Sequence, residues 1–304
     1  MKYLSLILAI FLCAAAPGKI NPGKGPGNRK ADYGEVQSLI RKSLNREIAN
    51  ENPGEIELFF LGVALYGKQD VFMRETLYAQ EIFEERYAEA YGGSRASHSL
   101  SLINNKKTSK RHLFANKDNL SEILSFLGEK MGDEDILFIY FTSHGSRDHK
   151  LSLILPSQFR SGLDSKEIRS MLDDADIPWR VLVVSACFSG GFIPELEAPN
   201  SIVATAADAD HSSFGCTDTR NFTYYGEALF KRQMKEGMDL VDALNGIPPI
   251  IIEMEAEQGY EHSNPQLSIG EDFLKHWEKY KADLTARLKE RTQVTLKPKP
   301  KKRW

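Results

Sequence analysis

The sequence predicts an α/β fold in which a mostly parallel β-sheet is covered on both faces by helices. Two observations carry this prediction. The first is a series of short apolar runs, such as residues 135–142 (DILFIYFT) and 179–185 (WRVLVVS), which are too short for free-standing helices and are rich in β-branched and aromatic residues. The second is that helix-length segments separate these runs, and this alternation is typical of a parallel sheet buried on both sides.

The expected elements follow in chain order. Strands are predicted at residues 56–66, 98–103, 135–142, 179–185, 201–207 and 265–269. Helices are predicted at residues 33–48, 70–91, 118–131, 165–173, 225–234 and 240–257. Asp164 is expected to cap the helix that begins at residue 165, and Pro248-Pro249 to break the helical stretch that begins at residue 240. Residues 150–155 alternate apolar and polar side chains, which predicts one arm of a small hairpin.

The two ends of the chain are expected to lie outside the α/β domain, which spans residues 55–270. Residues 1–16 combine a short positive end, an apolar core and a small-residue segment, which predicts a signal peptide and an exported protein, periplasmic or extracellular. Residues 17–54 read as a flexible leader followed by a short helix, and residues 271–304 as a charged helix with a basic tail. The tail is expected to be solvated, and the alternative is a weak contact with an anionic surface.

The net charge and the cysteines of the sequence indicate what the protein binds and in which form its thiols occur. The 304 residues carry a net charge of -3, so the global basic charge that favours binding to nucleic acid is missing. Phe11 and Leu12 precede Cys13, which favours cleavage among the alanines that follow over lipidation of this cysteine. The mature chain would then keep Cys187 and Cys216, either as free thiols or as a disulfide that would silence a nucleophile.

Two predicted strands end on the side chains of a nucleophile and a base. Cys187 follows the strand at 179–185, and His144 follows the strand at 135–142. Because ligands bind at the carboxyl ends of strands in open α/β sheets, both groups are expected at one edge, where a thiol and an imidazole suit nucleophilic catalysis. A zinc site formed by His144, His149 and the cysteines is the alternative. The spacing lacks the clustering typical of zinc ligands, so no metal is expected.

The residues around these strand ends resemble a known family. The phrases YFTSHGS (140–146), SACFSGG (185–191) and ATAADADHSSFGCTD (204–218) resemble, in the same order, three blocks of the legumain-type cysteine peptidases of the caspase-like clan, closest to the bacterial branch. The resemblance implies a caspase-like three-layer sandwich. It also implies an endopeptidase without a cofactor that hydrolyses peptide or protein substrates through a thioester on Cys187, with His144 as general acid and base.

The resemblance also assigns roles around the nucleophile. The backbone N–H groups of Gly145 and Cys187 would form the oxyanion hole, since a developing oxyanion needs fixed donors. Ser212, Ser213 and Phe214 would form a wall of the substrate pocket.

Further positions concern specificity. Glu227 stands where the family has an acidic pocket floor, and Arg74 stands near its basic pocket residue. Asp70 lies near the place of the asparagine that orients the histidine. Ser185 departs from the pattern, because legumains have a glutamate there that helps recognise the asparagine amide. Strict specificity for asparagine is therefore not expected.

Two other functions fit the same residues. A transamidase or ligase would use the same acyl-enzyme, and an inactive caspase-like binding module would need only the fold. The presence of both His144 and Cys187 favours an enzyme over the binding module.

Overall fold

The structure is a computed structural model that describes residues 37–38, 40–44, 48, 54–91, 98–155, 160–234 and 239–296. The predicted signal peptide and the basic tail from residue 297 onward lie outside the described residues. Within the helix predicted at 33–48, residues 37–38 and 40–44 are helical. None of the described helices is both long and apolar enough to cross a lipid bilayer.

Six strands form the central sheet in the order β2-β1-β3-β6-β7-β8. Their bounds are Leu58–Ala64 for β1, Ser99–Ile103 for β2, Ile136–Thr142 for β3, Trp179–Ser185 for β6, Ser201–Thr205 for β7 and Gln266–Ile269 for β8. The first five strands of this order pair in parallel, and β8 joins the edge antiparallel to β7. A separate hairpin of β4 (Lys150–Ile154) and β5 (Arg160–Asp164) follows β3 and confirms the predicted arm.

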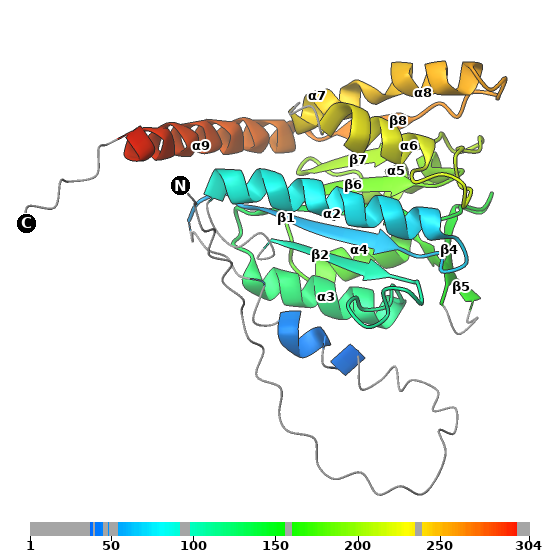
Figure 1. Cartoon of the computed structure of the whole chain (residues 1–304), viewed down its shortest axis with the longest axis horizontal. Helices are drawn as coiled ribbons and strands as arrows, with labels where there is room; N and C mark the ends of the chain where they lie inside the picture. Colours follow the sequence, from blue (N-terminus) through cyan, green and yellow to red (C-terminus); the bar gives the residue numbers. More distant parts are fainter. Residues whose placement is uncertain are drawn as a thin grey trace, which may run out of the picture. The chain divides into compact units, whose positions relative to one another are not determined.

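Helices cover both faces of the sheet (Figure 1). One face packs against α3 (Lys117–Lys130), α4 (Ser165–Asp174) and α5 (Ile193–Leu196). The other packs against α2 (Asp70–Tyr91), α6 (Tyr224–Gly226), the π-helical η2 (Glu227–Met234), α7 (Leu240–Asn245), α8 (Ile247–Ala256) and α9 (Glu271–Leu296). The predicted three-layer α/β sandwich with a mostly parallel sheet is confirmed.

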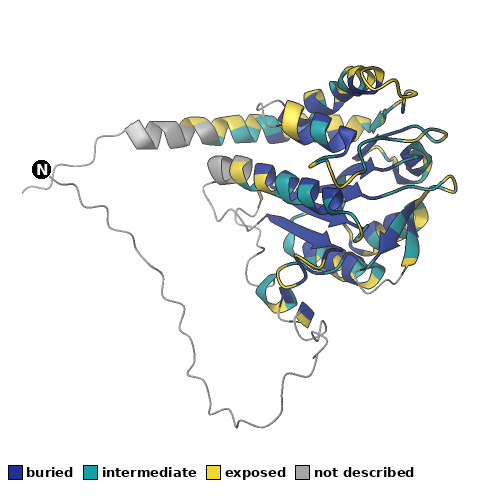
Figure 2. Ribbon diagram, turned by 45° about the vertical axis from the view of Figure 1, so that its right-hand side comes forward, coloured by how far each residue is buried: buried dark blue, intermediate teal, exposed yellow. Residues whose placement is uncertain are grey.

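The side chains of each central strand alternate between the two cores. In β1, Phe59 and Leu61 lie in the core beneath α3 and α4, whereas Leu58 and Phe60 lie in the core beneath α2. This period of two is the geometry of an extended strand, and both faces are apolar because helices cover both. Figure 2 accordingly shows the central strands as buried and the outer surfaces of the helices as exposed.

Helix ends follow local chemistry, with one difference from prediction. Asp164 caps α4 as predicted: its side chain accepts a hydrogen bond from Glu167 N, and the Glu167 side chain accepts one from Asp164 N. Pro248 and Pro249 were predicted to break a helix, but they lie in the first turn of α8. A proline is tolerated there because the N–H that it lacks has no partner within the helix. The interruption lies two residues before Pro248, at Gly246.

Candidate active site

The carboxyl ends of β3 and β6 bring the predicted base and nucleophile to the same level of the sheet. The register of these parallel strands pairs Thr142 with Ser185. His144 and Cys187 each lie two residues beyond this pair, and neighbouring strands are about 4.8 Å apart. Both side chains are only partly buried, as groups that meet a substrate must be. The predicted pair therefore shares one edge of the sheet.

The imidazole of His144 is held by an aromatic cradle and by one amide. The rings of Tyr66 and Phe72 pack against it at right angles, with centroids 4.5 and 5.2 Å away. Gln69 donates from Nε2 to Cys216 O at 2.9 Å, which turns its Oε1 atom toward Nε2 of His144. Because that oxygen only accepts, Nε2 carries the proton and Nδ1 is left as the basic nitrogen. Burial lowers the pKa of His144, which favours the neutral imidazole that a general base needs.

The residue that orients His144 was missed by sequence reasoning. The resemblance pointed to Asp70, whose carboxylate accepts hydrogen bonds from Asn105 Nδ2 at 2.8 Å and from Lys107. The imidazole contact comes from its neighbour Gln69. The only available signal in the sequence was that Gln69 lies in the loop that follows a predicted buried strand.

The thiol of Cys187 contacts the segment that the resemblance assigned to the substrate pocket. Its sulfur lies 3.4 Å from Ser213 O, to which it donates, and 3.3 Å from Ser213 N, from which it accepts. The Ser213 hydroxyl lies 3.7 Å from the same sulfur. Within the described part of the chain, no hydrogen bond joins this thiol to the imidazole of His144.

The turn after Cys187 has an uncommon backbone. Phe188 has a φ of 57°, in the left-handed region that non-glycine residues rarely adopt. Two contacts hold this conformation: Phe188 N donates to His211 O at 2.8 Å, and His149 Nδ1 donates to Phe188 O at 3.0 Å. His149 was noted in the sequence as a zinc ligand alternative, but the structure uses it to hold the turn. Within the described residues, no group of three His, Cys, Asp or Glu side chains is placed to bind a metal.

Gly145 lies directly against the backbone of Cys187. A Cβ atom at Gly145 would overlap Cys187 O and come within 3.1 Å of Cys187 N, so only glycine fits. Next to Gly145, the backbone hydrogen bonds run from Ser146 N to Lys150 O and from Ser152 N to His144 O. Neither of them uses the N–H group of Gly145. Among the described residues, the N–H groups of Gly145 and Cys187 have no hydrogen-bond acceptor. Both donors are therefore free for an oxyanion.

The predicted pocket wall lies beside the thiol. Ser213 contacts the sulfur, Ser212 is exposed, and the half-buried ring of Phe214 stacks on Tyr260 with centroids 4.4 Å apart. Ser185 is different because it is 2% exposed, and its hydroxyl lies 3.1 Å from Thr223 Oγ1. It is part of the support beneath the site.

Glu227 and Arg74 have partners of their own. Glu227 pairs with Arg220 at 2.7 Å, with Arg232 at 3.3 Å and with Lys231 at 3.5 Å. Arg74 donates to the carbonyl oxygens of residues 218 and 220. The cation nearest to Glu227 is thus Arg220, and the role of Arg74 in the substrate pocket stays a prediction. The role of Glu227 as the floor of the specificity pocket stays a prediction.

The sequence model of the peptidase C13 family matches residues 64–274, which is more than two thirds of the chain and includes both strand ends. The chain belongs to the peptidase C13 family. This is the legumain family, and the chain is accordingly a cysteine-type peptidase, a hydrolase that acts on peptides or proteins. No curated protein matches the sequence.

Solved structures similar to this C13 peptidase include caspases. Caspase-1 from Spodoptera frugiperda has 11% sequence identity and a TM-score of 0.46, over 73% of this chain and 92% of that chain. The structure titled pro-sf-caspase-1 has 10% identity and a TM-score of 0.45, over 73% and 94% of the two chains. The structure of drICE has 8% identity and a TM-score of 0.38, over 76% and 95%.

The two cysteines of the described residues are both free in this C13 peptidase. Cys187 and Cys216 are therefore present as thiols and do not form the disulfide that the sequence left open.

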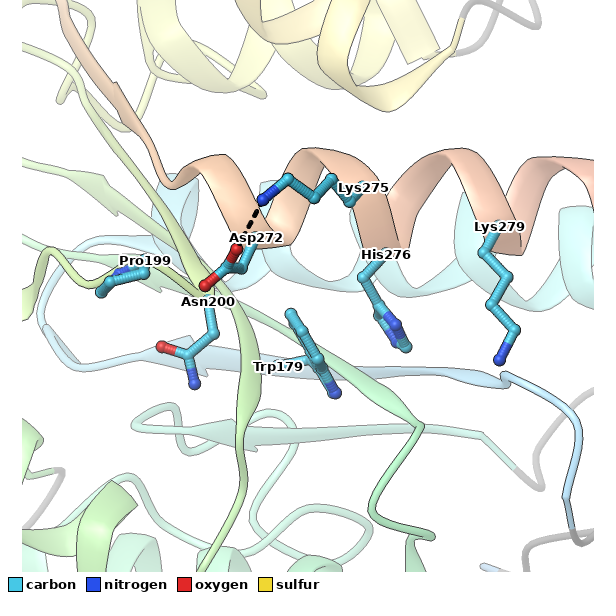
Figure 3. Close-up of a pocket in the computed structure, with 7 residues that line it drawn as sticks. All are labelled: Trp179, Pro199, Asn200, Asp272, Lys275, His276 and Lys279. Atoms are coloured by element: carbon cyan, nitrogen blue, oxygen red, sulfur yellow. Dashed lines mark hydrogen bonds and ion pairs between the residues drawn. The ribbon is translucent and has the colours of Figure 1, made fainter.

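A surface pocket of about 590 Å³ lies at the other end of β6, between the start of that strand and α9 (Figure 3). It is lined by Trp179, Pro199, Asn200, Asp272, Lys275, His276 and Lys279. Because Trp179 begins β6 and Ser185 ends it, this pocket is separate from the edge that carries His144 and Cys187.

Proposed function

We propose that this C13 peptidase is an exported endopeptidase that cleaves peptide bonds through a thioester on Cys187, with His144 as general acid and base. The observation that carries the proposal is the pairing of Thr142 with Ser185, which places His144 and Cys187 at one level of neighbouring strands. Export is inferred from residues 1–16 alone.

The chemistry follows from the atoms at the edge. Nδ1 of His144 takes the thiol proton, and the sulfur attacks the scissile carbonyl carbon to form a tetrahedral intermediate. The N–H groups of Gly145 and Cys187 donate to its oxyanion. The carbon–nitrogen bond then breaks, and His144 returns the proton to the departing amine. Water activated by His144 finally hydrolyses the thioester, which releases a carboxylate and the free thiol.

The Cys187 thiol is not hydrogen-bonded to His144 in the described part of the free protein, and this is compatible with the proposed steps. The Cys187 sulfur contacts Ser213 in the free protein, and catalytic hydrogen bonds often tighten only when substrate binds. Ser213 and Phe214 then form the wall along which the peptide lies, next to the sulfur.

A peptide-library digest tests the proposal. The mature protein should produce new carboxyl termini, whereas Cys187→Ala and His144→Ala should each lose nearly all turnover, and the double variant should lose little more. Near-normal turnover by Cys187→Ala would refute the thioester mechanism.

Products that carry a new amide when an amine is added would identify a transamidase instead. Intact mass of the exported protein tests cleavage after the alanines at 14–16.

A further inference from the structure

A fully buried carboxylate reaches from α2 toward the strands that carry the catalytic pair. Glu75 is 0% exposed. Its Oε2 atom accepts hydrogen bonds from Thr223 N at 2.8 Å and from Thr223 Oγ1 at 2.9 Å, and its Oε1 atom accepts one from Thr142 Oγ1. A Cβ atom at Gly226 would overlap Oε2, so the backbone there leaves room for the carboxylate. The fold thus provides a fitted place for this charge.

The donors come from the segments that carry the reacting groups. Thr142 lies two residues before His144. Ser185, two residues before Cys187, shares a hydrogen bond of 3.1 Å with Thr223. Thr223 itself ends the segment whose Ser213 contacts the Cys187 thiol. One carboxylate therefore connects the base, the nucleophile and the segment that holds the nucleophile.

The free-energy cost of burying a carboxylate argues that Glu75 does more than fill space in the core. Burying a carboxylate without a cationic partner is costly, and a well-packed apolar side chain is often at least as stable. Burial raises the pKa of Glu75 to about 7, even though its hydrogen bonds act in the opposite direction. The titratable groups that face it are the Tyr140 hydroxyl on β3 and the Cys216 thiol, and burial raises the pKa of both. The Tyr140 hydroxyl and the Cys216 thiol therefore both stay neutral in the pH range in which Glu75 gains or loses its proton.

We propose that Glu75 is a positioning residue for peptide hydrolysis, whose carboxylate fixes the spacing of His144 and Cys187 by accepting the hydrogen bonds of Thr142 and Thr223. This inference rests on the function proposed above. Oε2 accepts two hydrogen bonds from Thr223, so a proton on Glu75 would lie on Oε1 and the Thr142 hydroxyl could no longer donate to that oxygen. Full activity therefore requires the carboxylate form. Small displacements of reacting groups are enough to slow a reaction strongly.

The first experiment compares Glu75→Gln with Glu57→Gln. Glu57 is the matched control, since it is also 0% exposed but pairs with His98 at the other end of β1. We expect Glu75→Gln to lower kcat by about tenfold or more with little change in KM, and Glu57→Gln to keep the wild-type kcat. The kcat of the wild-type enzyme should fall on acidification through about pH 7, and this limb should be missing in Glu75→Gln. Equal loss of kcat in both variants, or a wild-type kcat and pH profile in Glu75→Gln, would overturn the proposal.

A second pair of variants covers the case in which Glu75→Gln does not fold. Thr142→Ser keeps the hydroxyl and should keep activity, whereas Thr142→Val keeps the volume and should lose kcat to the same degree as Glu75→Gln. The rate at which iodoacetamide alkylates Cys187, read on the Cys187 peptide by mass spectrometry, supplies a readout that needs no substrate. A wild-type protein that cleaves no peptide would refute the proposed function. An alkylation rate identical in wild type, Glu75→Gln and Thr142→Val would refute the positioning role.

Discussion

The side-chain oxygen of Gln69 lies against Nε2 of His144, because the amide nitrogen of Gln69 is engaged by the carbonyl of Cys216. A backbone carbonyl that is distant in sequence thereby decides which nitrogen of His144 is basic. The Gln69 amide fixes the tautomer and orientation of the imidazole, as the carboxylate does in a Ser-His-Asp triad. Unlike that carboxylate, it adds no charge that would stabilise an imidazolium.

Removing this amide should slow the chemical step. We expect Gln69→Ala to lower kcat by about 10- to 100-fold with little change in KM, since the imidazole loses its fixed tautomer and orientation. Gln69→Glu keeps the acceptor oxygen and adds a negative charge, so it should raise the pKa of His144 and move the acidic limb of kcat/KM to higher pH. Steady-state kinetics over a range of pH measures both. Unchanged kcat in Gln69→Ala would contradict the orienting role.

A side chain at Gly145 should damage the proposed oxyanion hole. Gly145→Ala places a methyl group against the Cys187 carbonyl, so the backbone must move, and we expect kcat to fall by about 100-fold or more. Gly162→Ala in β5 is the control, because its Cβ atom would have its nearest contact at 3.4 Å. Kinetics together with thermal unfolding would separate loss of catalysis from loss of fold. The prediction is wrong if both variants are equally active.

The two free thiols should react differently. Burial raises the pKa of Cys216 far above its ordinary value, and the thiolate is the reactive form. We therefore expect iodoacetamide at pH 7 to label Cys187 in the native protein and both cysteines in urea. Cys216→Ser should leave the alkylation of Cys187 unchanged. Peptide mapping by mass spectrometry gives the answer, and equal labelling of both cysteines in the native state would contradict it.

The charge on Glu75 should lower stability as the pH rises from 5 to 8. Its pKa of about 7 in the folded state lies above the ordinary value of 4.5, so its contribution is fully present below pH 4.5 and is lost as pH rises through 7. The free energy of unfolding of wild type, relative to Glu75→Gln, should fall by on the order of 3 kcal/mol between pH 5 and pH 8. Urea titrations of both proteins at several pH values measure this difference. The comparison cancels the effect of partly buried histidines such as His112, whose lowered pKa acts in the opposite direction below pH 6.5.

The sequence by itself determined most of the architecture and predicted which two residues react. Apolar runs and their spacing predicted β6 with both its ends and α2 with both its ends, because strand and helix formation respond to neighbouring side chains. Asp164 was recognisable as a cap for the same reason, since a cap and its partner are three residues apart. Cys187, His144 and Gly145 follow strands that any parallel sheet would align.

Only the tertiary structure decided what surrounds that pair. Gln69 and His144 are 75 residues apart, and Glu75 and Thr223 are 148 residues apart. No local pattern predicts such partners, because they are chosen by how α2 packs on the sheet. The same reason explains why Glu227 pairs with Arg220, and why Gln69 contacts the imidazole in place of Asp70. Propensity and periodicity act over a few residues, whereas a hydrogen-bond partner is set by packing across the whole domain.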